Sequence, residues 1–252
     1  MIDTALSLEI IILAAGVFLL AGTVKGALGI GLPTVSVSML AQIIEPRMAI
    51  AFLLLPALVS NTWQIYRGGQ IMRSARKLWP FVLVMAVIMF ISSLFAAHAS
   101  TRALIAGIGL MVVLWTLMSL VRTPPKVPDH LDRPLQVLMG AISGVIGGLT
   151  SMWSPPMVIY LLSTRCNKED FVRFTGFIIL CGTVPLTAGY IANGLMNKAL
   201  ALASVLMIVP TLAGFVVGEY LRRFMGDRQF EKVLLVIFFF MGLNLIRRAI
   251  LL

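Results

Sequence analysis

The sequence predicts an all-α, polytopic membrane protein, and three observations support that fold class. Hydrophobic residues make up 60% of the 252 residues and charged residues only 12%, whereas soluble domains carry about 25% charged residues. Apolar stretches of about 20 residues, long enough to cross a bilayer as helices, recur along the whole chain. The longest polar stretch, RTPPKVPDHLDRP at 122–134, is too short to form a soluble domain.

Ten apolar segments follow one another along the chain. The first has an acidic N-terminal flank and no cleavage site, so we predict a transmembrane helix and not a signal peptide. The second and seventh are short, and each follows a Gly- and Pro-containing break, which indicates one arm of a helical hairpin. The segments cover about residues 5–24, 33–44, 46–66, 78–97, 102–121, 134–149, 155–164, 171–192, 199–220 and 230–250.

The two halves of the chain show the same order of features, which indicates an internal duplication. Each half opens with a glycine-broken hairpin, continues with a long helix ending near a tyrosine and a glycine (NTWQIYRGG, PLTAGYIANG), and closes with a pair of helices. We therefore predict a first transmembrane repeat at 1–122, a cytoplasmic linker at 123–133 and a second repeat at 134–252. Because each half holds about five segments, an odd number, the second repeat is predicted to be inverted.

The distribution of basic residues supports this inverted topology, because cytoplasmic loops are enriched in Lys and Arg. If the loop at 67–77 is cytoplasmic, alternation places 14 of the 20 basic residues inside, five outside and Lys25 within the first hairpin. Both termini are then extracytoplasmic, in a multi-pass protein of the cytoplasmic (inner) membrane. Arg247 and Arg248 fall outside, against the rule, and the sequence offers no explanation for them.

The first hairpin, GTVKGALGIGLPTVSV at 22–37, places a charge and helix breakers in an apolar run. Broken backbone is tolerated at membrane depth only inside protein or along a water-filled cavity. The helix that begins at Pro33 exposes N–H groups near Thr34 and Ser36, which favours an anion. Lys25 at mid-membrane costs at least about 2.5–3.5 kcal/mol, and an anionic substrate would offset that cost. Alternatively, Lys25 extends from a helix end to the membrane interface.

The second hairpin, GAISGVIGGLTSMWSPP, has Ser143 where the first has Lys25, so the predicted site is asymmetric. Its hydroxyl groups and the Trp153 indole N–H suit anion oxygens, although such hydroxyls often satisfy loosened backbone instead. On the following long helix of the first half, Asn61 and Gln64 share a face, where they line a cavity or join helices. The candidate substrate-binding residues are Lys25, Gly29, Gly31, Thr34, Ser36, Asn61, Gln64, Thr150, Ser151, Trp153 and Ser154.

Glu219 is a candidate for proton coupling, with a local ion pair to Arg222 and Arg223 as the alternative. The two cysteines and two histidines lack metal-ligand spacing, so we expect no metal and no cofactor. The spans contain no convergent acid–base set, so we expect no enzyme activity. The expected partners are a small anion, the lipid bilayer and a proton or other coupling ion, while the bases between apolar spans argue against nucleic acid. Assembly into a homo-oligomer is compatible with the sequence.

The pattern resembles the TauE/SafE family of sulfite and organosulfonate exporters. The resemblance lies in GTVKGALGIGLP, in its echo GAISGVIGGLTSMWSPP and in GEYLRRFMGDRQFEKVLLVIFFFMGL near the end, and it covers essentially the whole chain. It implies transport of a small sulfur-containing anion across the cytoplasmic membrane, usually outward. A secondary transporter working by alternating access is the first hypothesis, and a passive anion channel with the same positive site is the alternative.

Overall fold

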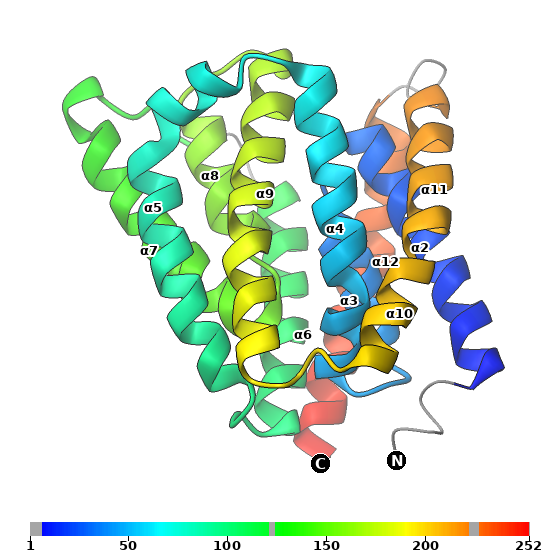
Figure 1. The fold of residues 1–252 in the computed structure, drawn as a ribbon. Coiled ribbons are helices and arrows are strands. Elements are labelled where there is room, and N and C mark those ends of the chain that lie inside the picture. The colour runs from blue at the N-terminus through cyan, green and yellow to red at the C-terminus, as the bar shows by residue number, and fades with distance from the viewer. Residues whose placement is uncertain (1–6, 121–123, 222–226, 252) are drawn as a thin grey trace.

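The structure, a computed structural model of the 252-residue chain, describes residues 7–120, 124–221 and 227–251, without the side chains of 118–120, 168 and 227–238. These residues form a bundle of α-helices with one short 3-10 turn and, within the described ranges, no strand (Figure 1). The all-α class is therefore confirmed.

Each predicted segment corresponds to a helix, except that the ninth is divided in two at Met207. The first half contains α2 (Leu8–Leu28), α3 (Leu32–Leu40), α4 (Pro46–Gly68), α5 (Ile71–Ala96) and α6 (Thr101–Leu120). The second half contains η1 (Asp129–Leu131), α7 (Asp132–Thr150), α8 (Ser154–Ser163), α9 (Lys168–Ala192), α10 (Lys198–Leu206), α11 (Ile208–Leu221) and α12 (Asp227–Leu251).

Two predicted boundaries are wrong. The basic residues before 78 belong to the first turns of α5, which begins at Ile71, and not to a loop. The break in the first hairpin, expected over 26–33, is confined to Gly29–Gly31, because α2 continues through Lys25 to Leu28. In both places the helix continues through charged residues or glycine, whereas an apolar segment is taken to end at such residues.

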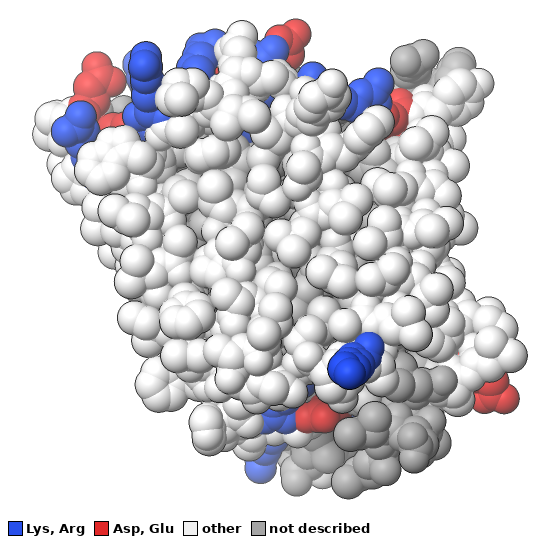
Figure 2. Space-filling model, in the orientation of Figure 1, with Lys and Arg blue, Asp and Glu red and all other residues white. Residues whose placement is uncertain are grey.

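The surface of the bundle is that of a multi-pass membrane protein. Within the described residues, α2, α4, α5, α9 and the α10–α11 pair are long and apolar enough to cross a bilayer. Leucine, isoleucine and valine side chains are exposed along these helices. Figure 2 shows charged side chains gathered at the two ends of the molecule, with an uncharged band between them.

Glycines set the closest helix contacts. A Cβ atom on Gly22 or Gly26 of α2 would overlap backbone atoms of α11, and one on Gly214 or Gly218 of α11 would overlap backbone atoms of α2. The contacts advance in the same direction along both helices, so α2 and α11 run parallel. Small residues at this spacing let membrane helices approach closely.

The α5–α7 contact repeats this arrangement in the other part of the bundle. Gly140, Gly144 and Gly148 of α7 lie against the backbone near Phe81, Met85 and Met89 of α5, again in parallel. Across the two halves, α4 also packs on α9 and α6 on α12. Such exchange of equivalent helices is what a duplication with opposite orientations would produce; the inverted repeat and its boundaries stay predictions.

Two arginines that the sequence analysis predicts to lie outside, Arg248 and Arg47, cap helix ends. Arg248 of α12 donates from Nη1 to the carbonyl oxygens of Ala41 (2.7 Å) and Gln42 (2.8 Å), just beyond α3. Arg47 donates from Nε to the carbonyl oxygen of Ala96 at the end of α5 (3.1 Å). The last carbonyl groups of a helix lack intrahelical donors and carry negative partial charge, so both guanidinium groups stabilise helix ends.

The glycine contacts yield a stability prediction. Replacing Gly22 with Ile should overpack the α2–α11 contact, at a cost of about 1–3 kcal/mol or more, and lower the Tm of the detergent-solubilised protein by about 5 °C. A Cβ atom on Gly16 of the same helix would meet no other atom within 4 Å, so Gly16→Ile is the matched control. Equal Tm values for the two variants would contradict this packing.

Candidate functional site

The first hairpin turns inside the bundle, next to α4. Gly29 ends α2 with φ +80° and Gly31 precedes α3 with φ +106°. Both angles lie in the left-handed region that disfavours residues with a Cβ atom. Pro33 lies in the first turn of α3, where its missing N–H leaves no helical bond unmade. The chain therefore reverses its direction through Gly29, Ile30 and Gly31, which belong to neither helix.

Lys25 points from α2 into the protein. Its side chain is among the largest that are fully buried, with 1% of its surface exposed. The ammonium group donates to Ser60 Oγ (3.0 Å) and to Asn61 Oδ1, both on α4. Asn61 precedes the end of α4 by seven residues, which places it about 10 Å from that end. The ammonium group of Lys25 is therefore enclosed by the bundle and does not extend to the surface of the protein.

The partners of Lys25 are neutral. Asn61 is held in place because its Nδ2 donates to the carbonyl oxygen of Ala57 (2.7 Å), which leaves Oδ1 for the ammonium group. No ion pair to Lys25 occurs among the described residues. Dipoles therefore solvate the buried charge, and its net positive charge is not cancelled by a carboxylate.

Gln64 connects three elements around this site. Its Nε2 donates to the carbonyl oxygen of Gly29 (3.2 Å) in the hairpin and to that of Val172 (3.0 Å) on α9. Its Oε1 is buried and has no partner within the described ranges. The absence of a side chain at Gly176 leaves room for the amide, because a Cβ there would lie 3.1 Å from Nε2. Gln64 thus joins α4 to the hairpin and to α9.

The polar side chains of the second hairpin differ in their hydrogen bonding: one bonds to the backbone, and two are unpaired among the described residues. Thr150 Oγ1 donates to the carbonyl oxygen of Ile146 (2.7 Å) and accepts from the N–H of Met152 (3.2 Å), so it satisfies loosened backbone. Ser151, with φ +58°, and Trp153 are both buried. Among the described residues, their Oγ and Nε1 atoms have no hydrogen-bond partner. A buried unpaired donor is costly, so both atoms are candidates for contact with a ligand.

The candidate residues fall into two groups. Lys25, Gly29, Asn61 and Gln64 meet around the first hairpin. Thr150, Ser151, Trp153 and Ser154 surround the second, where Trp153 packs on Gly182 of α9 and Thr150 on Gly107 of α6. Thr34 and Ser36 are buried in α3, and Ser36 donates to the carbonyl oxygen of Leu32 (2.7 Å). Within the described ranges no hydrogen bond joins the two groups, and their binding role stays a prediction.

Ser60 is a contact of Lys25 that the sequence analysis missed. It precedes Asn61 directly and lies four residues before Gln64, so the three polar residues belong to one face of α4. That spacing was the available signal. Nothing local in the sequence, however, indicates that α2 would place its lysine opposite this face.

Ion pairs connect helices at the end of the bundle that carries most basic residues, which we call the basic end. Arg67 of α4 pairs with Glu219 of α11 (2.6 Å), and Arg73 of α5 pairs with Asp170 of α9 (3.2 Å). Arg173 also donates from Nε to the carbonyl oxygen of Gly68 (2.8 Å). The partner of Glu219 is therefore distant in sequence. Its alternative partners, Arg222 and Arg223, lie outside the described residues.

Comparison with known proteins gives one match. The model of the family described as "Sulfite exporter TauE/SafE" matches residues 14–245, nearly the whole chain. Neither the curated proteins nor the solved structures returned a match. In the described part of the chain, no group of three or more His, Cys, Asp or Glu side chains is arranged to hold a metal ion.

The geometry around Lys25 gives a second stability prediction. Asn61→Leu should remove the acceptor that faces the ammonium group and leave a buried charge short of one partner, at a cost of about 1–3 kcal/mol. Thermal unfolding in detergent measures the loss. Thr62→Val is the control, because that hydroxyl donates only to the carbonyl oxygen of Leu58 on its own helix (2.8 Å). If Asn61→Leu were no less stable than Thr62→Val, the Lys25–Asn61 contact would not matter.

Proposed function

Because this chain belongs to the sulfite exporter TauE/SafE family, we propose that it is a secondary transporter of a small sulfur-containing anion, such as sulfite or an organosulfonate. Outward movement across the cytoplasmic membrane is the proposed direction. The single observation that carries the substrate class is the ammonium group of Lys25, buried inside the bundle with neutral partners.

The chemistry of that group suits an oxyanion. A lysine ammonium group has three N–H donors, of which Ser60 and Asn61 take two. The third is available to a substrate oxygen, and a charge-assisted bond to an anion is roughly twice as strong as a neutral one. An anion at Lys25 would therefore compete well with the Asn61 carbonyl group. Its charge would also cancel the charge that the protein leaves uncompensated.

The second hairpin supports the proposal with neutral donors. Trp153 Nε1 and Ser151 Oγ are buried without partners in this conformation. We assign both to the substrate, which would meet them when the helices between the two hairpins move. The first turn of α3, behind Pro33, would add backbone N–H groups on the other side.

A carrier fits this conformation better than a channel. The ammonium group is buried, and at the basic end the Arg73–Asp170 pair and the bond from Arg173 to Gly68 join neighbouring helices, which would close this end. Alternating access requires such a closed layer to open on one side while the other side closes. A passive channel would need a continuous open path past Lys25 in its conducting state.

The proposed orientation follows from charge. The basic end faces the cytoplasm under the positive-inside rule. The beginning of α2 and the end of α12 lie together at the opposite end (Figure 1), so both termini would be extracytoplasmic in the cytoplasmic membrane. A small anion and the bilayer are the proposed partners, and Glu219 remains the candidate for proton coupling.

Flux measurements test the role of Lys25. In proteoliposomes, Lys25→Met should abolish uptake of labelled sulfite, because the buried cation that binds the anion is lost. Arg76, exposed at the basic end, supplies the control Arg76→Gln, which should retain uptake. Sulfite should also raise the Tm of the wild-type protein, since a ligand stabilises the state that binds it, and should not raise that of Lys25→Met.

Unchanged flux in Lys25→Met would remove Lys25 from the site. Counterflow separates the two transport mechanisms. In proteoliposomes loaded with unlabelled sulfite, a carrier accelerates the entry of labelled sulfite, and a channel does not. If counterflow were absent and Lys25→Met still abolished uptake, the anion site would be supported and alternating access would be overturned.

The ion pair at the basic end gives a prediction about gating. Asp170→Asn should weaken the contact between α5 and α9 and shift the population toward a state open at this end. Ser74, 3% exposed and next to Arg173 in a small pocket, reports this opening when replaced by Cys in a Cys166→Ser, Cys181→Ser background. Maleimide labelling should be severalfold faster with Asp170→Asn than with Asp129→Asn, a control that removes an exposed carboxylate outside this contact. Equal rates would show that the pair does not hold the end closed.

A further inference from the structure

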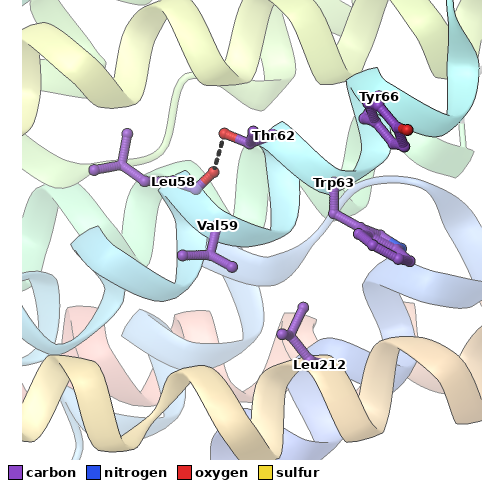
Figure 3. A pocket seen from close by; sticks show the side chains of 6 residues that line it. All are labelled: Leu58, Val59, Thr62, Trp63, Tyr66 and Leu212. Carbon is purple, nitrogen blue, oxygen red and sulfur yellow. Dashed lines mark hydrogen bonds between the residues drawn. The ribbon is translucent and has the colours of Figure 1, made fainter.

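A groove opens between α4 and α11 on the outside of the bundle (Figure 3). Its volume is about 400 Å³, and it is lined by Leu58, Val59, Thr62, Trp63, Tyr66 and Leu212. The hydroxyl of Thr62 donates to the carbonyl oxygen of Leu58, so the lining offers an occupant an apolar surface. Trp63 is 45% exposed and Tyr66 is 80% exposed, which shows that this side of α4 faces the surroundings of the protein.

A cation lies at the end of the groove nearest the basic end. Arg67 follows Tyr66 directly on α4, and its guanidinium lies over the Trp63 ring, 5.7 Å from the centroid. The Arg67 side chain is 55% exposed. Trp and Tyr are the residues that concentrate at membrane–water interfaces, with their rings at head-group level. The groove therefore runs from an interfacial cation and two aromatic rings toward a purely apolar segment.

We propose that this groove binds an anionic glycerophospholipid, with one acyl chain between α4 and α11 and the phosphate on Arg67. The charge is complementary, because the leaflet facing a basic end is the one rich in anionic lipid. The side chains of Leu58, Val59 and Leu212 match an acyl chain, and the Thr62 hydroxyl between them is already bonded to its own helix. A second copy of the chain in the groove would have to bury the Arg67 charge in an apolar contact, at an energetic cost.

Glu219 sets the strength of this site. It takes one guanidinium N–H of Arg67 at 2.6 Å, whereas the guanidinium group has five donors and can bind a phosphate through two of them. The carboxylate nevertheless repels the phosphate. Removing either partner of the Arg67–Glu219 pair breaks the same ion pair but changes lipid binding in opposite directions. A purely structural ion pair would not show that difference.

The groove and the buried lysine share one helix. The outer face of α4 lines the groove through Val59, Thr62 and Trp63, while its inner face holds Lys25 through Ser60 and Asn61. A lipid in the groove would therefore contact the same helix that positions the ammonium group of Lys25. The lipid site itself does not depend on the proposed transport function, and it is tested by binding alone.

Native mass spectrometry of the purified full-length protein tests the proposal with phosphatidylglycerol and phosphatidylcholine as probes. The wild-type protein should bind one phosphatidylglycerol in preference to phosphatidylcholine. Arg67→Gln should weaken phosphatidylglycerol binding about fivefold, the effect of about 1 kcal/mol for one basic residue at a membrane surface, and Glu219→Gln should strengthen it. Leu212→Trp should fill the groove and reduce binding of both lipids.

Two control variants match the chemistry of these changes. Arg76→Gln removes an exposed cation at the same end, and Leu83→Trp adds an indole at an exposed site on α5; neither should alter the phosphatidylglycerol preference. Parallel loss in Arg67→Gln and Glu219→Gln would overturn the proposal, as would equal effects of Arg67→Gln and Arg76→Gln. A dimer that is lost with Leu212→Trp while lipid binding is unchanged would assign the groove to a second copy and likewise overturn it.

Discussion

The structure depends on keeping the positive charge of Lys25 inside a bundle in which, among the described residues, no carboxylate pairs with it. On α2, Gly22 and Gly26 contact α11, while Lys25, between them in sequence, reaches α4. The glycines bring α2 close to one neighbour, and the lysine connects it to another. A lysine at membrane depth costs at least about 2.5–3.5 kcal/mol, so the α2–α4 contact must be maintained for the charge to stay solvated by Ser60 and Asn61.

The same requirement explains where the remaining polar side chains lie. Backbone that leaves its helix inside a membrane must find partners within the protein. Gln64 supplies a donor to the hairpin carbonyl of Gly29, Thr150 supplies an acceptor to Met152, and Arg248 supplies donors beyond α3. Arg248, one of the arginines that the sequence analysis could not explain, is thus held by carbonyl oxygens that lack helical donors.

Hydropathy predicted the helices well because the bilayer imposes the same length and polarity on every span. It failed at the start of α5, since Arg73 and Lys77 continue the helix into the interface, where charge is solvated. It could not provide the partners of Lys25 or Glu219. Those contacts depend on how α2 rotates against α4 and how α4 approaches α11, and residues 35 to 152 positions apart determine them. Local pattern contains no information about such lateral packing.

The difference between the two hairpins bears on how an anion could be bound and then released. Ser143, at the position corresponding to Lys25, is fully buried, and its hydroxyl has no partner in the part of the chain that the structure describes. Two lysines facing each other would hold an anion strongly and repel each other when it left. A single lysine has Ser60 and Asn61 to return to, so its neutral partners stabilise the empty site and lower the cost of release. Under the proposed function, the first hairpin supplies the charge that attracts the substrate, and the second supplies neutral donors such as Trp153 that orient it without trapping it.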